Sequence, residues 1–343
     1  MRAAVLESFG SPLVVRDDLP EPAPTEREAL VRVRATGVCG TDLKLAAGAL
    51  GRADVLPIVP GHEVAGELVA AVDDLPAGQR VACYIYDSCG ECAWCAQGRP
   101  TLCPSRIRTG LERNGGLAEY VAVPRKSLLP FSDGLSFEAA AVSMDAVASP
   151  WSALRGHGRV QDGETVLVVG AGGLGLNGVQ IARAAGAAVA VVDPVAERRE
   201  TALGLGAALA VDPDDAEDVR TWAGGGVDVA FEASGRRAGF DVGVACLRRG
   251  GRLVACGYQV GVEYGIESSR LVLEEISIMG SVCASYEQTR AALQSVERGE
   301  LTPTILDRLP LEDVNRALER LAAGDVLGRL VIEPGRGSRG GPA

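Results

Sequence analysis

The chain has 343 residues, of which 47% are hydrophobic, and its 45 acidic and 34 basic residues give a net charge of -11. This length and apolar content suffice for an extensive core and about two globular domains. The sequence contains no basic stripe and no uninterrupted apolar run of membrane-spanning length, so we expect neither nucleic acid nor a membrane as a partner.

The first 145 residues have the pattern of a mostly β domain. Short runs such as EALVRVRA at 28–35 and GELVAAV at 66–72 alternate apolar and polar residues or are rich in β-branched ones. Proline- and glycine-rich segments such as PEPAPTE and VLPIVPGHE separate these runs. Strands punctuated by such turns predict a sheet or barrel rather than a helical domain.

Three side chains of metal-binding type stand among these strands. Cys39 lies in GVCGTD, and His62 and Glu63 lie in PGHE. A cysteine, a histidine and a carboxylate would leave zinc an open position for water or substrate, which is typical of a catalytic rather than a structural zinc. The alternative for His62 is an isolated, hydrogen-bonded core histidine.

Four of the nine cysteines follow in one loop. Cys89, Cys92, Cys95 and Cys103 have the spacing C-x2-C-x2-C-x7-C. Four thiolates on one loop suit a closed, structural zinc site. Bacterial iron–sulfur proteins share the start of this run, but their fourth spacing is three residues, and this chain has no second run. Reduced, metal-binding thiols, and an amino end without a signal-peptide core, predict a cytoplasmic protein.

From about residue 150 the pattern changes to strand, glycine turn and helix. TVLVV at 165–169 precedes GAGGLG at 170–175, an Ala- and Leu-rich helix and then AVAVVD at 188–193. This succession predicts a doubly wound parallel sheet with a G-x-G-x-x-G dinucleotide fingerprint. Gly170 would permit the tight turn, Gly172 the approach of a pyrophosphate, and Gly175 close packing of helix and strand. A glycine-rich turn without a ligand is the alternative.

Asp193 ends the next predicted strand, 23 residues after Gly170. A carboxylate at this position accepts hydrogen bonds from the adenosine ribose hydroxyls and repels a 2′-phosphate, so it favours NAD over NADP. Arg198 and Arg199 in the segment that follows are only a partial counterweight. The alternative for Asp193 is a turn carboxylate before Pro194.

The chain is predicted to return to its first domain after about residue 285. Two amphipathic helical segments, YEQTRAALQSVERG and LEDVNRALERLAAG, precede the short apolar run GRLVIEP. The closing residues have nothing to bury and are predicted to form a flexible tail. We therefore expect one domain of residues 1–146 and 285–335, a second of residues 147–284, and a tail of residues 336–343.

GVCGTD, GHE, the four-cysteine loop and GAGGLG, in this order, closely resemble the zinc-dependent medium-chain alcohol dehydrogenase family over nearly the whole chain. The resemblance implies an α/β protein: a GroES-like β-barrel catalytic domain with an inserted Rossmann domain, NAD, two zinc ions per chain, and a homodimer or homotetramer. It implies hydride transfer between an alcohol, expected to be a secondary one, and NAD, giving a ketone or, from a primary alcohol, an aldehyde. A reductase of activated C=C or C=N bonds, and a non-catalytic redox sensor that binds NAD and zinc, remain alternatives.

Residue-by-residue matching to this family adds a metal ligand. Cys39 and His62 match two catalytic zinc ligands, and Asp42 matches the carboxylate that orients the histidine. Glu63 matches a glutamate that can enter the coordination sphere. The third ligand is a cysteine in many members, and its position falls on Asp145. Because other members have a carboxylate there, we predict Asp145 as a zinc ligand; a helix-capping aspartate is the alternative.

The resemblance also assigns residues that contact substrate and cofactor. Thr41 matches the hydroxyl that contacts the substrate oxygen and begins a proton relay, whereas the relay histidine of several members falls on Lys44. Leu174 matches the apolar residue behind the nicotinamide, and Arg198 a basic residue near the ribose. The predicted cofactor-binding residues are Gly170, Gly172, Gly173, Leu174, Gly175, Asp193 and Arg198.

Overall fold

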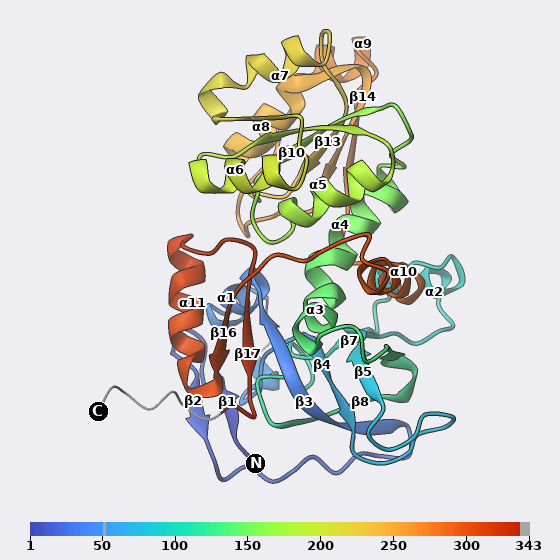
Figure 1. Ribbon diagram of the computed structural model, residues 1–343, viewed down its shortest axis with the longest axis vertical. Coiled ribbons are helices and arrows are strands. Elements are labelled where there is room, and N and C mark those ends of the chain that lie inside the picture. The colour runs from blue at the N-terminus through green and yellow to red at the C-terminus, as the bar shows by residue number, and fades with distance from the viewer. Residues whose placement is uncertain (51–52, 337–343) are drawn as a thin grey trace. The chain divides into compact units, whose positions relative to one another are not determined.

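The computed structural model describes residues 1–50 and 53–336, and the chain folds into two compact units. The first unit consists of Met1–Asp145, Ser285–Arg298 and Ile305–Ala343, and the second of Ala146–Ala284 and Gly299–Thr304. Figure 1 shows the carboxyl-terminal segments of the first unit, in red, beside its amino-terminal strands, in blue. The chain therefore leaves the first unit, forms the second, and returns.

A seven-stranded sheet organises the first unit, and β3 is its central strand. Buried and exposed residues alternate along the first half of β3, as expected for a strand with one face on the core. β3 pairs antiparallel with β4, β8 and β17. The strands are, in sheet order, β16 (Ile305–Pro310), β17 (Arg329–Glu333), β3 (Glu28–Val38), β4 (Glu63–Leu68), β5 (Arg80–Cys83) and β9 (Leu128–Pro130), with β8 (Tyr120–Pro124) also on β3.

Five helices and two short strand pairs complete the first unit among the described residues. The helices are α1 (Gly40–Ala46), α2 (Ala93–Ala96), α3 (Phe137–Val142), α10 (Tyr286–Glu297) and α11 (Val314–Ala323). The strand pairs are β1 (Ala3–Val5) with β2 (Val14–Arg16), and β6 (Tyr86–Asp87) with β7 (Ile107–Arg108). A capping box of Ser285 and Gln288 starts α10, and Gly324, at φ +77°, ends α11.

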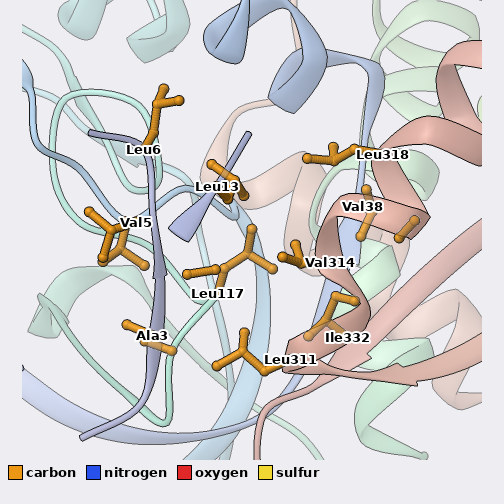
Figure 2. Close-up of a cluster of buried hydrophobic side chains, with 14 of the residues drawn as sticks. Ala3, Val5, Leu6, Leu13, Val38, Leu117, Leu311, Val314, Leu318 and Ile332 are labelled. Carbon is orange, nitrogen blue, oxygen red and sulfur yellow. The ribbon is translucent and has the colours of Figure 1, made fainter. Parts of the chain in front are cut away.

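A shared core explains why the chain returns to the first unit. Figure 2 shows Leu6 and Leu13 from the amino-terminal segment in one buried cluster with Leu311, Val314 and Ile332 from the carboxyl-terminal segment. Each of these side chains is almost completely buried. Burial of one Leu, Ile or Val side chain stabilises a fold by about 1.5–3 kcal/mol, so this cluster holds the two ends of the chain in one unit.

The second unit is built on the predicted parallel sheet. Its strands, in sheet order, are β12 (Leu209–Val211), β11 (Ala188–Val192), β10 (Thr165–Val169), β13 (Val227–Glu232), β14 (Leu247–Ala255) and β15 (Ser277–Gly280). Its helices are α4 (Ala148–Trp151), α5 (Gly175–Ala184), α6 (Ala196–Gly204), α7 (Glu217–Trp222), α8 (Arg237–Cys246) and α9 (Ser268–Leu273). Four consecutive buried residues in β10 show that both faces of the sheet are covered.

The strand order reverses between β10 and β13. From β10 the chain proceeds through β11 and β12 on one side of the sheet, and then through β13, β14 and β15 on the other. In open parallel sheets of this type, ligands bind outside the carboxyl ends of the strands at this reversal. The predicted fingerprint at 170–175 directly follows β10 and thus stands at this point.

The structure differs from the expected boundaries in three places. Ala146, expected in the first domain, begins the second unit. Gly299–Thr304 belongs to the second unit, because Gln180 of α5 makes two hydrogen bonds with the main chain of Thr302. Arg336, expected in the flexible tail, is fixed instead by bonds from its guanidinium to Glu333 and to the carbonyl of Arg308. The remaining tail, residues 337–343, lies outside the described residues. Among the described residues, no helix is long and apolar enough to cross a bilayer.

Candidate zinc and dinucleotide sites

The structure brings together the four residues that were predicted to surround the catalytic zinc. Cys39 stands between β3 and α1, His62 directly precedes β4, Glu63 is the first residue of β4, and Asp145 lies in a π-helical turn after α3. One ligand atom from each residue lies within 4.8 Å of the others, and all four side chains are buried. A sulfur, a nitrogen and two carboxylates thus converge in the first unit.

Two glycines make room for this cluster. Gly37 faces Glu63 across the β3–β4 pair, and a Cβ on Gly37 would stand 1.8 Å from the Glu63 carboxylate. Gly61, directly before His62, has φ +97°, a conformation that side-chain-bearing residues rarely adopt. Gly61 is therefore needed for the turn that places His62 in the cluster.

Asp42 orients both Cys39 and His62. Its Oδ2 accepts a 2.8 Å hydrogen bond from the Cys39 amide, and its Oδ1 lies 3.2 Å from His62 Nδ1. Nε2 of His62 lies 3.7 Å from the Asp145 carboxylate and has no hydrogen-bond partner, although it is buried. Burial alone would lower the pKa of His62, but the nearby carboxylates of Asp42 and Asp145 raise it well above its usual value.

Sequence reasoning missed Arg329, the first residue of β17. Its guanidinium contacts Glu63 Oε1 at 3.0 Å and 2.7 Å, Cys39 Sγ at 3.3 Å and Asp145 Oδ2 at 3.4 Å. Arg329 is only 5% exposed. Burial raises the pKa of Glu63 to about 7, even though Arg329 acts to lower it. The only signal in the sequence was an arginine at the start of the apolar run RLVIE.

This cluster fits a divalent cation. With Cys39 as a thiolate and both Glu63 and Asp145 ionised, three anionic side chains face one guanidinium, which leaves two negative charges in a buried site. Uncompensated buried charge is strongly unfavourable, and a zinc ion would neutralise it. Nε2 of His62, buried and without a hydrogen bond, is the type of donor atom that zinc takes.

The four-cysteine loop forms a second cluster with metal-binding geometry. The sulfur of Cys103 lies 3.5 Å from that of Cys89, while Cys95 lies 3.6 Å from Cys92 and 4.0 Å from Cys89. Zinc–sulfur bonds of about 2.3 Å at tetrahedral angles place neighbouring sulfurs about 3.8 Å apart. None of the nine cysteines forms a disulfide, and amides of residues 91 and 92 lower the pKa of Cys89 to about 6. This loop fits a zinc ion.

The dinucleotide fingerprint has the expected conformation. Gly170 has φ +89°, and a Cβ on it would stand 3.0 Å from Ser234. A Cβ on Gly175 would stand 1.8 Å from the Gly170 carbonyl, whereas Gly172 has open space above it. Leu174 precedes α5, and the Gly173 carbonyl accepts a bond from Asn177. The loop therefore leaves a space at the start of α5 that fits a pyrophosphate.

Asp193 lies directly after β11, beside this loop. It is buried, and its two carboxylate oxygens accept bonds from the amides of Ala171 and Val195 at 2.7 Å and 2.8 Å. The guanidinium of Arg198 is 3.8 Å from the same carboxylate. Arg199 bonds instead to the Asp193 carbonyl and to Asp212. The Asp193 carboxylate is therefore fixed to the fingerprint, and Arg199 is already paired.

Thr41 and Lys44 both lie on α1, close in sequence to the metal ligand Cys39. Both side chains are partly exposed. Positions three apart on a helix lie on the same face, so the structure places these two residues along one side of α1.

A parallel dinucleotide-binding sheet and two zinc-binding clusters define a zinc-dependent, dinucleotide-linked dehydrogenase. Residues 25–133 match the family model of the alcohol dehydrogenase GroES-like domain, and residues 173–298 match that of the zinc-binding dehydrogenases. The chain belongs to the zinc-dependent medium-chain alcohol dehydrogenase family. This result confirms the predicted family and fold class.

Known relatives agree over almost the full length. An alcohol dehydrogenase of Geobacillus stearothermophilus is 36% identical over 97% of this chain and 99% of its own. An L-threonine 3-dehydrogenase of Streptomyces coelicolor is 33% identical over 94% of this chain and 97% of its own. The crystal structure of an NAD-dependent alcohol dehydrogenase superposes with a TM-score of 0.92, at 31% identity, over 98% of this chain and 100% of that one.

Proposed function

We propose that this protein transfers a hydride between a secondary alcohol and NAD, giving a ketone, or an aldehyde from a primary alcohol. The observation that carries the proposal is that ligand atoms of Cys39, His62 and Asp145 lie within 4.8 Å of one another, and that Nε2 of His62 is buried there without a hydrogen bond. The fingerprint loop with Asp193 beside it supports NAD as the second reactant. Glu63 is the fourth group of this centre.

The residues of the chain prepare the reaction by holding the zinc ligands in place and by moving a proton. Bound zinc would supply a Lewis acid that stabilises negative charge on the substrate oxygen, and NAD would supply the hydride acceptor. Asp42 holds the His62 ring so that Nε2 faces the cluster, and Arg329 holds Glu63. Thr41 accepts the hydroxyl proton of the substrate and releases its own hydroxyl proton in turn, and Lys44, on the same face of α1, stands in the position of the relay histidine of several family members.

The cofactor loop supplies the remaining contacts in this proposal. Gly170, Gly172, Gly173 and Gly175 bring main-chain amides close to the pyrophosphate. Leu174 supports the nicotinamide, and Arg198 lies near the ribose, consistent with its place 3.8 Å from Asp193.

A combined metal and activity measurement tests the function. We expect about two zinc ions per chain and a nicotinamide absorbance change with at least one member of an alcohol and ketone panel. Turnover of activated C=C or C=N compounds, with no turnover of alcohols, would instead support the reductase. Bound zinc and NAD with no turnover of any compound would support the redox sensor.

Asp193 should make the enzyme prefer NAD to NADP. A charge-assisted hydrogen bond from the ribose contributes roughly 1.5–3 kcal/mol, which corresponds to about 10- to 150-fold in affinity. We expect kcat/KM to favour NAD by at least this factor, and Asp193→Asn to reduce the preference. Equal use of NAD and NADP by the wild type would show that Arg198 and Arg199 outweigh Asp193.

Loss of one thiolate from the four-cysteine loop should affect stability before chemistry. We expect Cys95→Ser to lower the melting temperature and to reduce zinc from about two to about one per chain, while turnover per remaining zinc changes little. Cys283→Ser, a partly exposed cysteine outside the loop, is the control. Two retained zinc ions with unchanged melting would contradict a structural zinc at Cys89, Cys92, Cys95 and Cys103.

The second unit carries an apolar edge that suits a homodimer or homotetramer. β15 is the outer strand of the parallel sheet, and Val272, Leu273, Ile278 and Val282 on or near it are exposed by 68%, 77%, 37% and 46%. An unpaired apolar edge strand of this kind is a template for pairing with another copy. Light scattering should give a mass of two or four chains.

Nine thiols without a disulfide suit the reducing cytoplasm.

A further inference from the structure

Glu232 is a buried carboxylate that the proposed chemistry does not use. It is the last residue of β13, has no exposed surface, and lies opposite Val169, the last residue of β10. The strand order reverses between these two strands. Glu232 therefore stands at the carboxyl edge of the sheet, where parallel sheets bind their ligands.

The carboxylate bonds to the turn that follows its own strand. Oε1 accepts bonds from the amides of Ser234 and Gly235, both at 2.9 Å, and from the Ser234 hydroxyl; Oε2 lies 3.2 Å from the Gly235 amide. The hydroxyl of Tyr264, nearby, donates to the Gly257 carbonyl at 3.3 Å. An ionised carboxylate accepts such bonds at both oxygens, which a glutamine cannot do.

This turn packs directly against the fingerprint loop. A Cβ on Gly170 would stand 3.0 Å from the main chain of Ser234, and the amide of Ala233 donates to the Val169 carbonyl at 2.9 Å. The first glycine of the fingerprint therefore packs against the turn that Glu232 holds, with too little space between them for a side chain.

Glu232 also ties in the loop after β14. Its main-chain carbonyl accepts bonds from the amides of Cys256 and Gly257 at 2.9 Å and 3.0 Å. A Cβ on Gly257 would stand 2.4 Å from the Gly235 amide. Three turns at the carboxyl edge of the sheet, after β10, β13 and β14, thus meet main chain to main chain around this one residue.

We propose that Glu232 is a positioning residue for the dinucleotide: its carboxylate fixes residues 233–235 against Gly170, so that the crevice at the strand reversal is formed before NAD binds. A crevice that is already in its binding shape loses less conformational entropy on binding. This inference rests on the proposed function, because it takes NAD as the ligand of the crevice.

The test is NADH binding, measured by titration calorimetry without alcohol on the zinc-loaded protein. We expect Glu232→Gln to raise the Kd for NADH by about tenfold, as for the loss of one charge-assisted hydrogen bond. Zinc content should be unchanged, and kcat at saturating NAD should stay within about twofold, because the hydrogen bonds of Glu232 given above are all with residues of the second unit. Ser234→Ala, which removes the hydroxyl that donates to Glu232, should raise the Kd for NADH by a smaller factor. This variant tests the inference if Glu232→Gln does not fold.

Glu164→Gln is the matched control. Glu164 is also a hydrogen-bonded carboxylate of the second unit, paired with Arg252, but it precedes β10 at the opposite end of that strand. This variant should lose stability and bind NADH as the wild type does. Equal NADH affinity of the wild type, Glu232→Gln and Ser234→Ala would overturn this inference but leave the proposed function standing. The same would follow if Glu164→Gln lost as much NADH affinity as Glu232→Gln. A wild type that binds no NADH would contradict the proposed function itself.

Discussion

Asp145→Asn is expected to remove the catalytic zinc and alcohol oxidation together. The Asp145 carboxylate lies 3.4 Å from Cys39 Sγ and 3.7 Å from His62 Nε2, so it shares a centre with both donors. The amide keeps the shape of the side chain but loses the negative charge that binds zinc. Removal of a residue that only hydrogen-bonds to a metal ligand lowers metal affinity or activity by about 10- to 100-fold. Loss of a residue that binds the metal directly should therefore lower activity more than about 100-fold.

Zinc per chain and turnover, measured on the same preparations, decide this prediction. We expect zinc to fall from about two to about one, with a melting temperature near that of the wild type. A chelator should likewise remove one zinc well before the other, since four thiolates hold zinc more tightly than a mixed site. Glu138→Gln, a carboxylate of α3 that pairs with Arg308, is the control. Two zinc ions with a near-normal rate would exclude Asp145 and leave Glu63 as the third ligand.

Sites made from neighbouring residues could be predicted from the sequence. The four cysteines lie within 15 residues, at 89–103, and the fingerprint lies within six, at 170–175. In such motifs the spacing itself limits the geometry, because a short loop can bring its side chains to one point in few ways. Hydrophobic periodicity likewise predicted the parallel sheet, which is confirmed.

Contacts between distant residues could not be predicted in this way. Arg329 lies 266 residues from Glu63 and 290 from Cys39. The run RLVIE predicts a strand, but the pairing of β17 with β3 depends on the whole first unit. Asp145, 106 residues from Cys39, was found only through the family resemblance. Glu232 was missed because its role depends on two neighbouring strands rather than on a motif.

Arg329→Met is expected to destabilise the first unit strongly. The Arg329 and Glu63 side chains are 6% and 0% exposed, and their closest atoms are 2.7 Å apart. Removing one partner of a buried ion pair leaves an unpaired charge and lowers the free energy of unfolding by about 3–5 kcal/mol. The exposed pair of Arg290 and Glu287 on α10, whose side chains are 54% and 69% exposed, is the comparison, where Arg290→Met should lower the free energy of unfolding by about 1 kcal/mol or less.

A second substitution separates the lost pairing from lost packing. If the unpaired Glu63 carboxylate causes most of the loss, Glu63→Gln in the Arg329→Met background should recover at least half of the unfolding free energy, because a neutral amide no longer needs the guanidinium. Urea unfolding of the wild type, both single variants and the double variant measures this coupling. An Arg329→Met protein within about 1 kcal/mol of the wild type, or a double variant no more stable than Arg329→Met, would show that Arg329 does not act through Glu63. The carboxylate would then be balanced mainly by the metal, and Glu63→Gln alone should lower zinc content as much as Asp145→Asn does.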